Sequence, residues 1–87
     1  MDFISVYGQI LSEKTGVKHL ACNGMIRLAF RDASLDPSTS NFKEYKEVFT
    51  KYLKSRLVKS NIDNSDEIVN LLMAKLIDNQ ILFTISP

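Results

Sequence analysis

The chain has 87 residues, of which 45% are hydrophobic and 24% charged, a composition typical of one folded globular domain and not of a disordered chain. Its formal net charge of +1 gives no general attraction to nucleic acid or to an acidic membrane. The single cysteine, Cys22, excludes an intrachain disulfide and a cysteine-rich zinc site. We therefore expect one domain over residues 1–87 that holds no cofactor and no metal.

The chain carries no evident membrane or export signal. No apolar run approaches the roughly 20 residues that span a bilayer. The N-terminus lacks a basic stretch followed by an apolar core and a small-residue cleavage site. The expected location is cytoplasmic, with no membrane partner.

The first predicted helix covers residues 2–14. Asp2 can cap its start, and Gly16 suits the left-handed conformation that ends many helices. Its apolar stripe consists of Phe3, Tyr7, Ile10 and Leu11.

The second predicted helix covers residues 17–33 and is apolar around most of its circumference, which is typical of a buried, central helix. Gly24 in its interior costs about 1 kcal/mol relative to alanine, which predicts close approach of a neighbouring backbone. Four polar residues follow one another at a spacing of four and predict a narrow solvent-facing strip: His19, Asn23, Arg27 and Arg31.

The third predicted helix covers residues 42–60 and follows a loop at residues 34–41. Asn41 and Glu44 form a capping-box pattern at its start, and Asn61 is a plausible terminator. Its inner face recurs at i, i+3, i+4 and i+7 and must be packed against other elements. This face consists of Tyr45, Val48, Phe49, Tyr52, Leu53, Arg56 and Leu57.

Charge is distributed unevenly along the second half of the chain. Residues 42–60 carry six basic and two acidic side chains, whereas residues 61–87 carry one basic and four acidic ones. We expect these two segments to lie near each other, within one chain or between copies. The basic residues are Lys43, Lys46, Lys51, Lys54, Arg56 and Lys59.

The fourth predicted helix covers residues 65–78, with Asn64 and Glu67 as a second capping pattern. Residues 81–85 are rich in β-favouring side chains and are expected to be extended or to form a short strand. The predicted fold class is all-α (mainly α), a four-helix bundle-like small domain with a short extended or β C-terminal segment.

Catalytic motifs are missing from the sequence. It contains no glycine-rich phosphate loop, no His-Glu-x-x-His and no Gly-x-Ser-x-Gly. His19 and Cys22 stand three apart and could pair as base and nucleophile, but a helix-end histidine beside a core cysteine is far more common. We therefore expect a protein that is not an enzyme.

These observations favour a small non-enzymatic regulatory or adaptor module that binds protein and self-associates. An isolated strand leaves unpaired backbone groups, so the C-terminal segment is expected either to pair with another chain, as the interaction element, or to pack over its own bundle as an extended tail. Its side chains are Ile81, Leu82, Phe83 and Ile85.

Two alternatives remain open. The first is a DNA-binding transcriptional regulator, although the 34–41 loop is too long for a helix-turn-helix turn and Asp66 and Glu67 would face phosphates badly. The second is a phosphotransfer or sensor-linked domain, in which His19 accepts a phosphoryl group while Arg27 and Arg31 hold its oxygens.

Overall fold

The structure is a computed structural model, and it describes residues 3–81 of the chain. Within these residues the chain is helical and forms no strand, which confirms the all-α class. The helices, in chain order, are α1 (Phe3–Thr15), α2 (His19–Asp32), α3 (Phe42–Glu47), the π-helical η1 (Val48–Leu53), α4 (Lys54–Lys59) and α5 (Ser65–Asp78).

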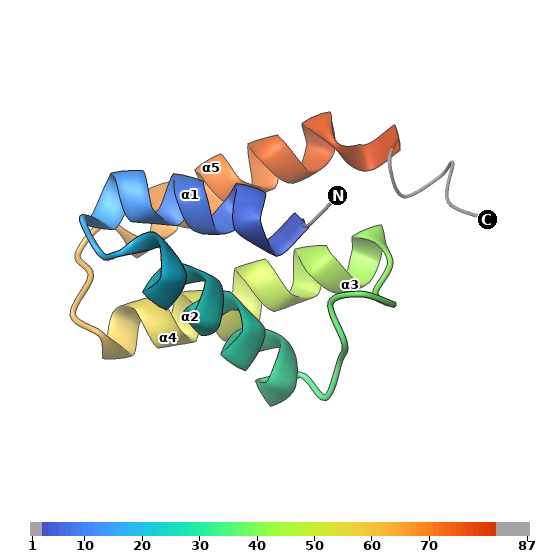
Figure 1. The fold of residues 1–87 in the computed structure, drawn as a ribbon, viewed down its shortest axis with the longest axis horizontal. Coiled ribbons are helices and arrows are strands. Elements are labelled where there is room, and N and C mark those ends of the chain that lie inside the picture. Colours follow the sequence, from blue (N-terminus) through green and yellow to red (C-terminus); the bar gives the residue numbers. More distant parts are fainter. Residues whose placement is uncertain (1–2, 82–87) are drawn as a thin grey trace.

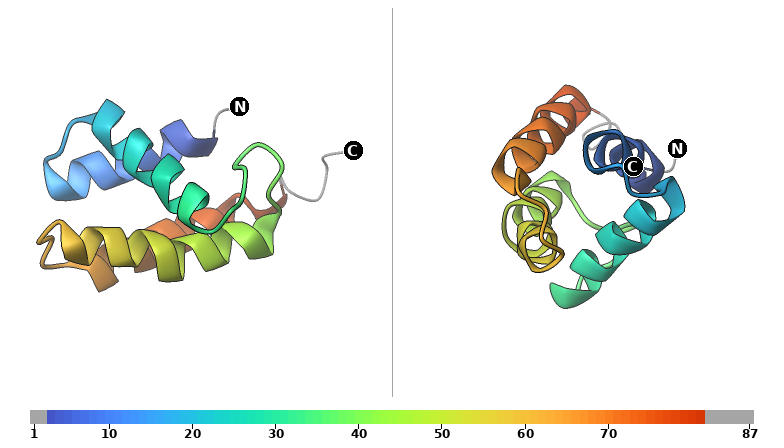
Figure 2. Two further views of the ribbon diagram at one scale, coloured as in Figure 1. Left: turned by 90° about the horizontal axis from the view of Figure 1, so that it is seen from below. Right: turned by 90° about the vertical axis from the view of Figure 1, so that its left-hand side faces the viewer.

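The elements α3, η1 and α4 follow one another without a break and form one long helix over residues 42–59. This long helix lies beside α5, and α1 lies beside α2 and α5 (Figure 1). Viewed along the long axis, α1, α2, the long helix and α5 surround a common centre in that order (Figure 2). The arrangement is a helical bundle with its core between α1, α2, the long helix and α5.

Aromatic side chains occupy the centre of the bundle. Phe30 packs edge-on against Tyr45 with ring centroids 4.7 Å apart, and Tyr7 packs edge-on against Phe49 at 5.0 Å. All four are almost completely buried, so the predicted core positions Tyr45 and Phe49 are confirmed. The prediction for Tyr52 is only partly right, because this residue is half-buried at the edge of the core.

Three helices end on a residue in the left-handed conformation, where φ is positive. Gly16 (φ 76°) and Asn61 (φ 61°) were predicted to end helices, and the structure confirms both. Ser34 (φ 58°) does the same at the end of α2 and was not predicted. After α2 and α4, the next residue, Leu35 or Ile62, packs on the core and donates its N–H to the carbonyl five residues earlier.

The start of α3 carries the predicted capping box. The Asn41 side chain accepts from the Glu44 N–H at 2.8 Å, and the Glu44 carboxylate accepts from the Asn41 N–H at 2.9 Å. The matching prediction for α5 is wrong, because the side chain of Asn64 makes no capping hydrogen bond.

The π-helical η1 explains how the long helix keeps one face inward. In an ideal α-helix of 3.6 residues per turn, each i+4 step drifts by about 40° around the axis. A π-helical turn holds more residues and therefore turns this drift back. The result is an unbroken i+4 series of completely or almost completely buried side chains: Tyr45, Phe49, Leu53 and Leu57.

The expectation that the second helix lies at the centre is wrong. It packs against α1 and η1 on one side and faces solvent on the other. Leu20 is 84% exposed and Leu28 is 40% exposed, although both contributed to the apolar composition that suggested burial.

The last described residues, Gln80 and Ile81, have helical backbone, so the expected extended segment does not begin at Ile81. The rest of that segment, including Leu82, Phe83 and Ile85, lies outside the described residues.

Candidate interaction site

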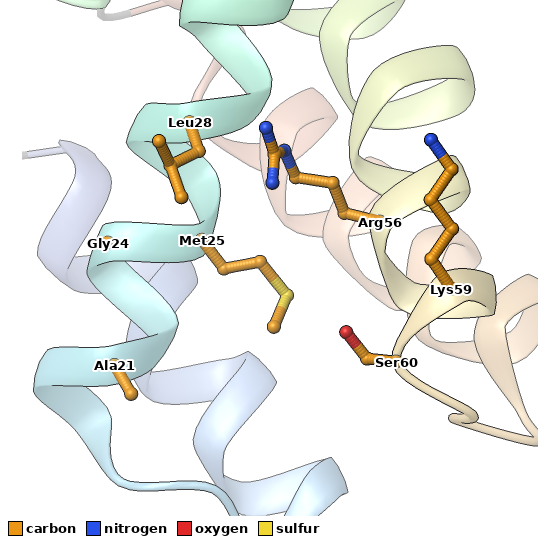
Figure 3. A pocket seen from close by; sticks show the side chains of 7 residues that line it. All are labelled: Ala21, Gly24, Met25, Leu28, Arg56, Lys59 and Ser60. Carbon is orange, nitrogen blue, oxygen red and sulfur yellow. The ribbon is translucent and has the colours of Figure 1, made fainter.

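A groove runs between α2 and α4, with a volume of about 330 Å³ (Figure 3). Its α2 side is apolar and its α4 side carries two cations and a hydroxyl. Met25 extends from α2 towards Ser60, and the Arg56 side chain extends from α4 towards Leu28. The residues that line it are Ala21, Gly24, Met25, Leu28, Arg56, Lys59 and Ser60.

The apolar wall of the groove continues onto the outer face of α2. Leu20, Gly24 and Leu28 follow one another at a spacing of four, so they lie on neighbouring parts of one helix face. The two leucines are exposed on either side of the glycine along this face. An apolar strip of this kind has no partner within residues 3–81.

The prediction that a neighbouring backbone approaches Gly24 closely is wrong. A Cβ added there meets no atom within 4 Å, so no neighbouring backbone of the described chain approaches it. The close approach lies at Gly8 instead, where an added Cβ would stand 1.7 Å from Oδ1 of Asn23. Within the described chain, Gly24 therefore has no packing reason to be glycine.

Arg56 joins α4 to α2 across one end of the groove. Its Nε and Nη2 donate to the two carboxylate oxygens of Asp32 at 2.7 and 2.9 Å. These hydrogen bonds, with the charges of Arg56 and Lys59, hold the pKa of the Asp32 carboxyl below its usual range. Arg56 was predicted on the buried face, but its side chain remains 32% exposed.

The predicted polar strip does not form a single site. His19 is partly buried and Asn23 is buried against α1, whereas Arg27 and Arg31 are exposed. The cause is the drift of about 40° at each i+4 step, which carries the strip from the α1 side into solvent. Along the helix axis, Arg27 lies about 12 Å and Arg31 about 18 Å from His19.

His19 and Cys22 each face a backbone carbonyl and not each other. The His19 Nε2 donates to the Ser5 carbonyl at 3.0 Å, and the Cys22 thiol donates to the Val17 carbonyl at 3.6 Å. Cys22 is completely buried, and burial raises the pKa of its thiol. The thiolate needed for nucleophilic chemistry is thus disfavoured.

The basic face of the long helix is partly matched by carboxylates. Lys54 lies 2.6 Å from Asp66 of α5, as expected from the charge distribution along the chain. Lys51 pairs with Glu47 within the helix at 3.5 Å. With Arg56 on Asp32, three of the six cations of residues 42–60 face a carboxylate.

Residues 3–81 hold no group of three or more histidine, cysteine or carboxylate side chains that could bind a metal ion. None of their helices has the length and apolar character needed to cross a membrane.

Comparison with known proteins returned no match, whether to a protein family, to a curated protein or to a solved structure.

Sequence reasoning missed the groove because its two walls are more than 20 residues apart in the sequence. Two local signals could have pointed to it. Leucines flank Gly24 at i−4 and i+4, and Arg56 interrupts an otherwise apolar helix face. Neither signal identifies which helix lies opposite.

Proposed function

We propose that the chain is a non-enzymatic protein-interaction module of regulatory or adaptor type, which binds a helix of another protein along the outer face of α2. The observation that carries the proposal is the face formed by Leu20, Gly24 and Leu28. Two exposed leucines flank a glycine with open space around it, beside an apolar groove. Apolar anchors docked in a groove are the usual mode of helix recognition.

The extent of this surface favours a macromolecular partner over a small ligand. Small-molecule sites bury most of the surface of the ligand that they hold. Here the apolar face continues along α2 to Leu20, which is exposed and is not part of the groove lining. A partner helix several turns long would cover both the groove and Leu20.

Gly24 supplies a second argument for a helical partner. Glycine in a helix interior costs about 1 kcal/mol relative to alanine, and no packing within the described chain requires it. The distance between packed helices depends on the side chains at their contact. Gly24 and the neighbouring Ala21 would let a partner helix approach α2 closely.

The proposal is tested by selecting from a displayed library of helical peptides. Wild-type protein is the bait, and Gly24→Gln is the blocked bait, because its side chain would occupy the groove without a clash at Cβ. Ala74→Gln on the exposed side of α5 is the matched control. We expect peptides that bind the wild type and the control but not Gly24→Gln. Failure to enrich any such peptide would show that the α2 face is not a docking surface.

A further inference from the structure

We propose that the partner helix is acidic: it places apolar side chains on the α2 face and a carboxylate on Arg56 and Lys59, where it replaces Asp32. This inference rests on the proposed function and specifies the chemistry of the partner. It follows from the charges around the groove, from the arrangement of the Arg56–Asp32 pair, and from the charges that a second copy of this surface would bring.

The cations lie at the rim of an apolar surface. Arg56 and Lys59 line the α4 side of the groove, opposite Leu28 and Met25 on α2 (Figure 3). Asp32 supplies one negative charge against these two positive ones, which leaves a local charge of +1. A carboxylate complements the positive charge of this surface, and bulky apolar side chains beside it complement the apolar α2 wall.

The Arg56–Asp32 pair is accessible to exchange. The Arg56 side chain is 32% exposed and that of Asp32 is 38% exposed, so a second carboxylate can approach without unfolding either helix. Asp32 is the final residue of α2, where the negative end of the helix dipole disfavours an anion. A carboxylate from a partner carries no such penalty and can make the same two-pronged contact with the guanidinium.

A second copy of the same surface is a poor occupant. The α2 face is bordered by the cations Arg56 and Lys59 of α4, and the exposed Arg31 lies on α2 itself, three residues after Leu28. Pairing this face with itself would bring like charges together, which is destabilising across an interface. The charge pattern therefore favours a different, acidic chain.

The probe is a pair of fluorescein-labelled, alanine-rich peptides of about 16 residues, which exceeds the length below which isolated helices are marginal. Each carries two leucines four residues apart. One has a glutamate a turn further on, and the other has glutamine at that position. Binding is followed by fluorescence polarisation, and circular dichroism confirms that every protein variant is folded.

We expect the glutamate peptide to bind wild-type protein about tenfold more tightly than the glutamine peptide, a difference of about 1.4 kcal/mol. This ratio should disappear in Arg56→Gln. Asp32→Asn should bind the glutamate peptide more tightly than the wild type does, because the competing carboxylate is gone. Gly24→Gln should bind neither peptide, and Ala74→Gln should behave as the wild type.

Several outcomes would overturn the inference. If both peptides bind the wild type equally and neither binds Gly24→Gln, the α2 face is a docking surface but does not recognise a carboxylate. If neither peptide binds, the acidic helix is wrong, while the library selection still decides the docking function. Octanoate tested alone is the small-molecule control: if it binds more tightly than the glutamate peptide, the groove is a small-ligand pocket. A wild-type dimer that Gly24→Gln converts to monomer would assign the face to self-association.

Discussion

At the scale of single residues, the two helix-interior glycines Gly8 and Gly24 have opposite surroundings. The Oδ1 of Asn23 lies against Gly8, is buried, and has no hydrogen-bond partner. The Asn23 backbone nitrogen would also stand only 3.3 Å from a Cβ added at Gly8, so α1 and α2 pack closely at this point. Gly24, one residue after Asn23 and therefore about 100° further around the same helix, faces open space.

The same substitution should therefore have opposite effects at the two positions. Gly24→Ala should stabilise the protein by about 1 kcal/mol through helix propensity. Gly8→Ala should lower the urea midpoint, because the added Cβ would displace the buried Asn23 side chain and would stand 3.3 Å from the Asn23 backbone nitrogen. Adding Asn23→Ala to Gly8→Ala should recover most of the loss. A higher midpoint for both single variants would show that the α1–α2 contact is looser than described.

At the scale of elements, local chemistry made some features predictable and left others hidden. The Asn41–Glu44 box and the turn residues Gly16 and Asn61 depend only on neighbouring backbone, and all three were predicted correctly. Burial of α2 was predicted wrongly because composition does not reveal which side of a helix has neighbours. The only sign of the π-helical η1 in the sequence is the i+4 spacing of the buried residues. This spacing also fits an ordinary α-helix, so η1 was not predicted.

The ion pair between Asp32 of α2 and Arg56 of α4 should make the protein more stable at neutral pH than at acidic pH. The pKa of Asp32 is lowered in the folded protein, so its pair with Arg56 stabilises above the unfolded pKa of about 3.9 and is lost as pH falls below it. Wild type should therefore exceed Asp32→Asn in urea midpoint at pH 7, and the difference should vanish near pH 2. A difference that is independent of pH would show that the carboxylate charge does not contribute.

At the scale of the whole molecule, one aromatic cluster joins the bundle. Phe49 contacts Tyr7 of α1 and lies 6.0 Å from the ring of Tyr45, which in turn packs on Phe30 of α2. This core was predictable from the spacing of the third helix, since an aromatic stripe must be buried to be stable. The groove was not predictable, because it depends on how α2 and α4 are packed.

Removing the centre of this cluster should be costly. Phe49→Ala should lose about 3–5 kcal/mol, a large part of the stability of a small domain. Tyr52→Ala at the edge of the core should lose less, because Tyr52 is only half-buried. Both are measured by urea denaturation. An equal loss in the two variants would contradict the central position of Phe49.

Self-association through the C-terminal segment remains a prediction, since residues 82–87 lie outside the described part. Replacing Leu82 and Phe83 with lysine should convert an assembled protein into a folded monomer, as measured by sedimentation. Ile77 on α5 and Ile81, three residues after the end of α5, are 56% and 64% exposed and would extend such an interface. A wild-type chain that is already monomeric at high micromolar concentration would refute this prediction.

The π-helical η1 also gives the long helix one residue more than an α-helix needs to span the same buried face. Deleting the exposed Lys51 changes the buried series from three steps of four residues to steps of four, three and four, which an ordinary α-helix keeps on one face. The shortened chain should still fold cooperatively, with α3 and α4 in their present orientation. Deleting the exposed Asn70 from α5 should instead turn Leu72 and Leu76 away from the core, because α5 has no widened turn to absorb the change. Among changes of chain length, natural or engineered, η1 should be the helical segment that tolerates a one-residue deletion best.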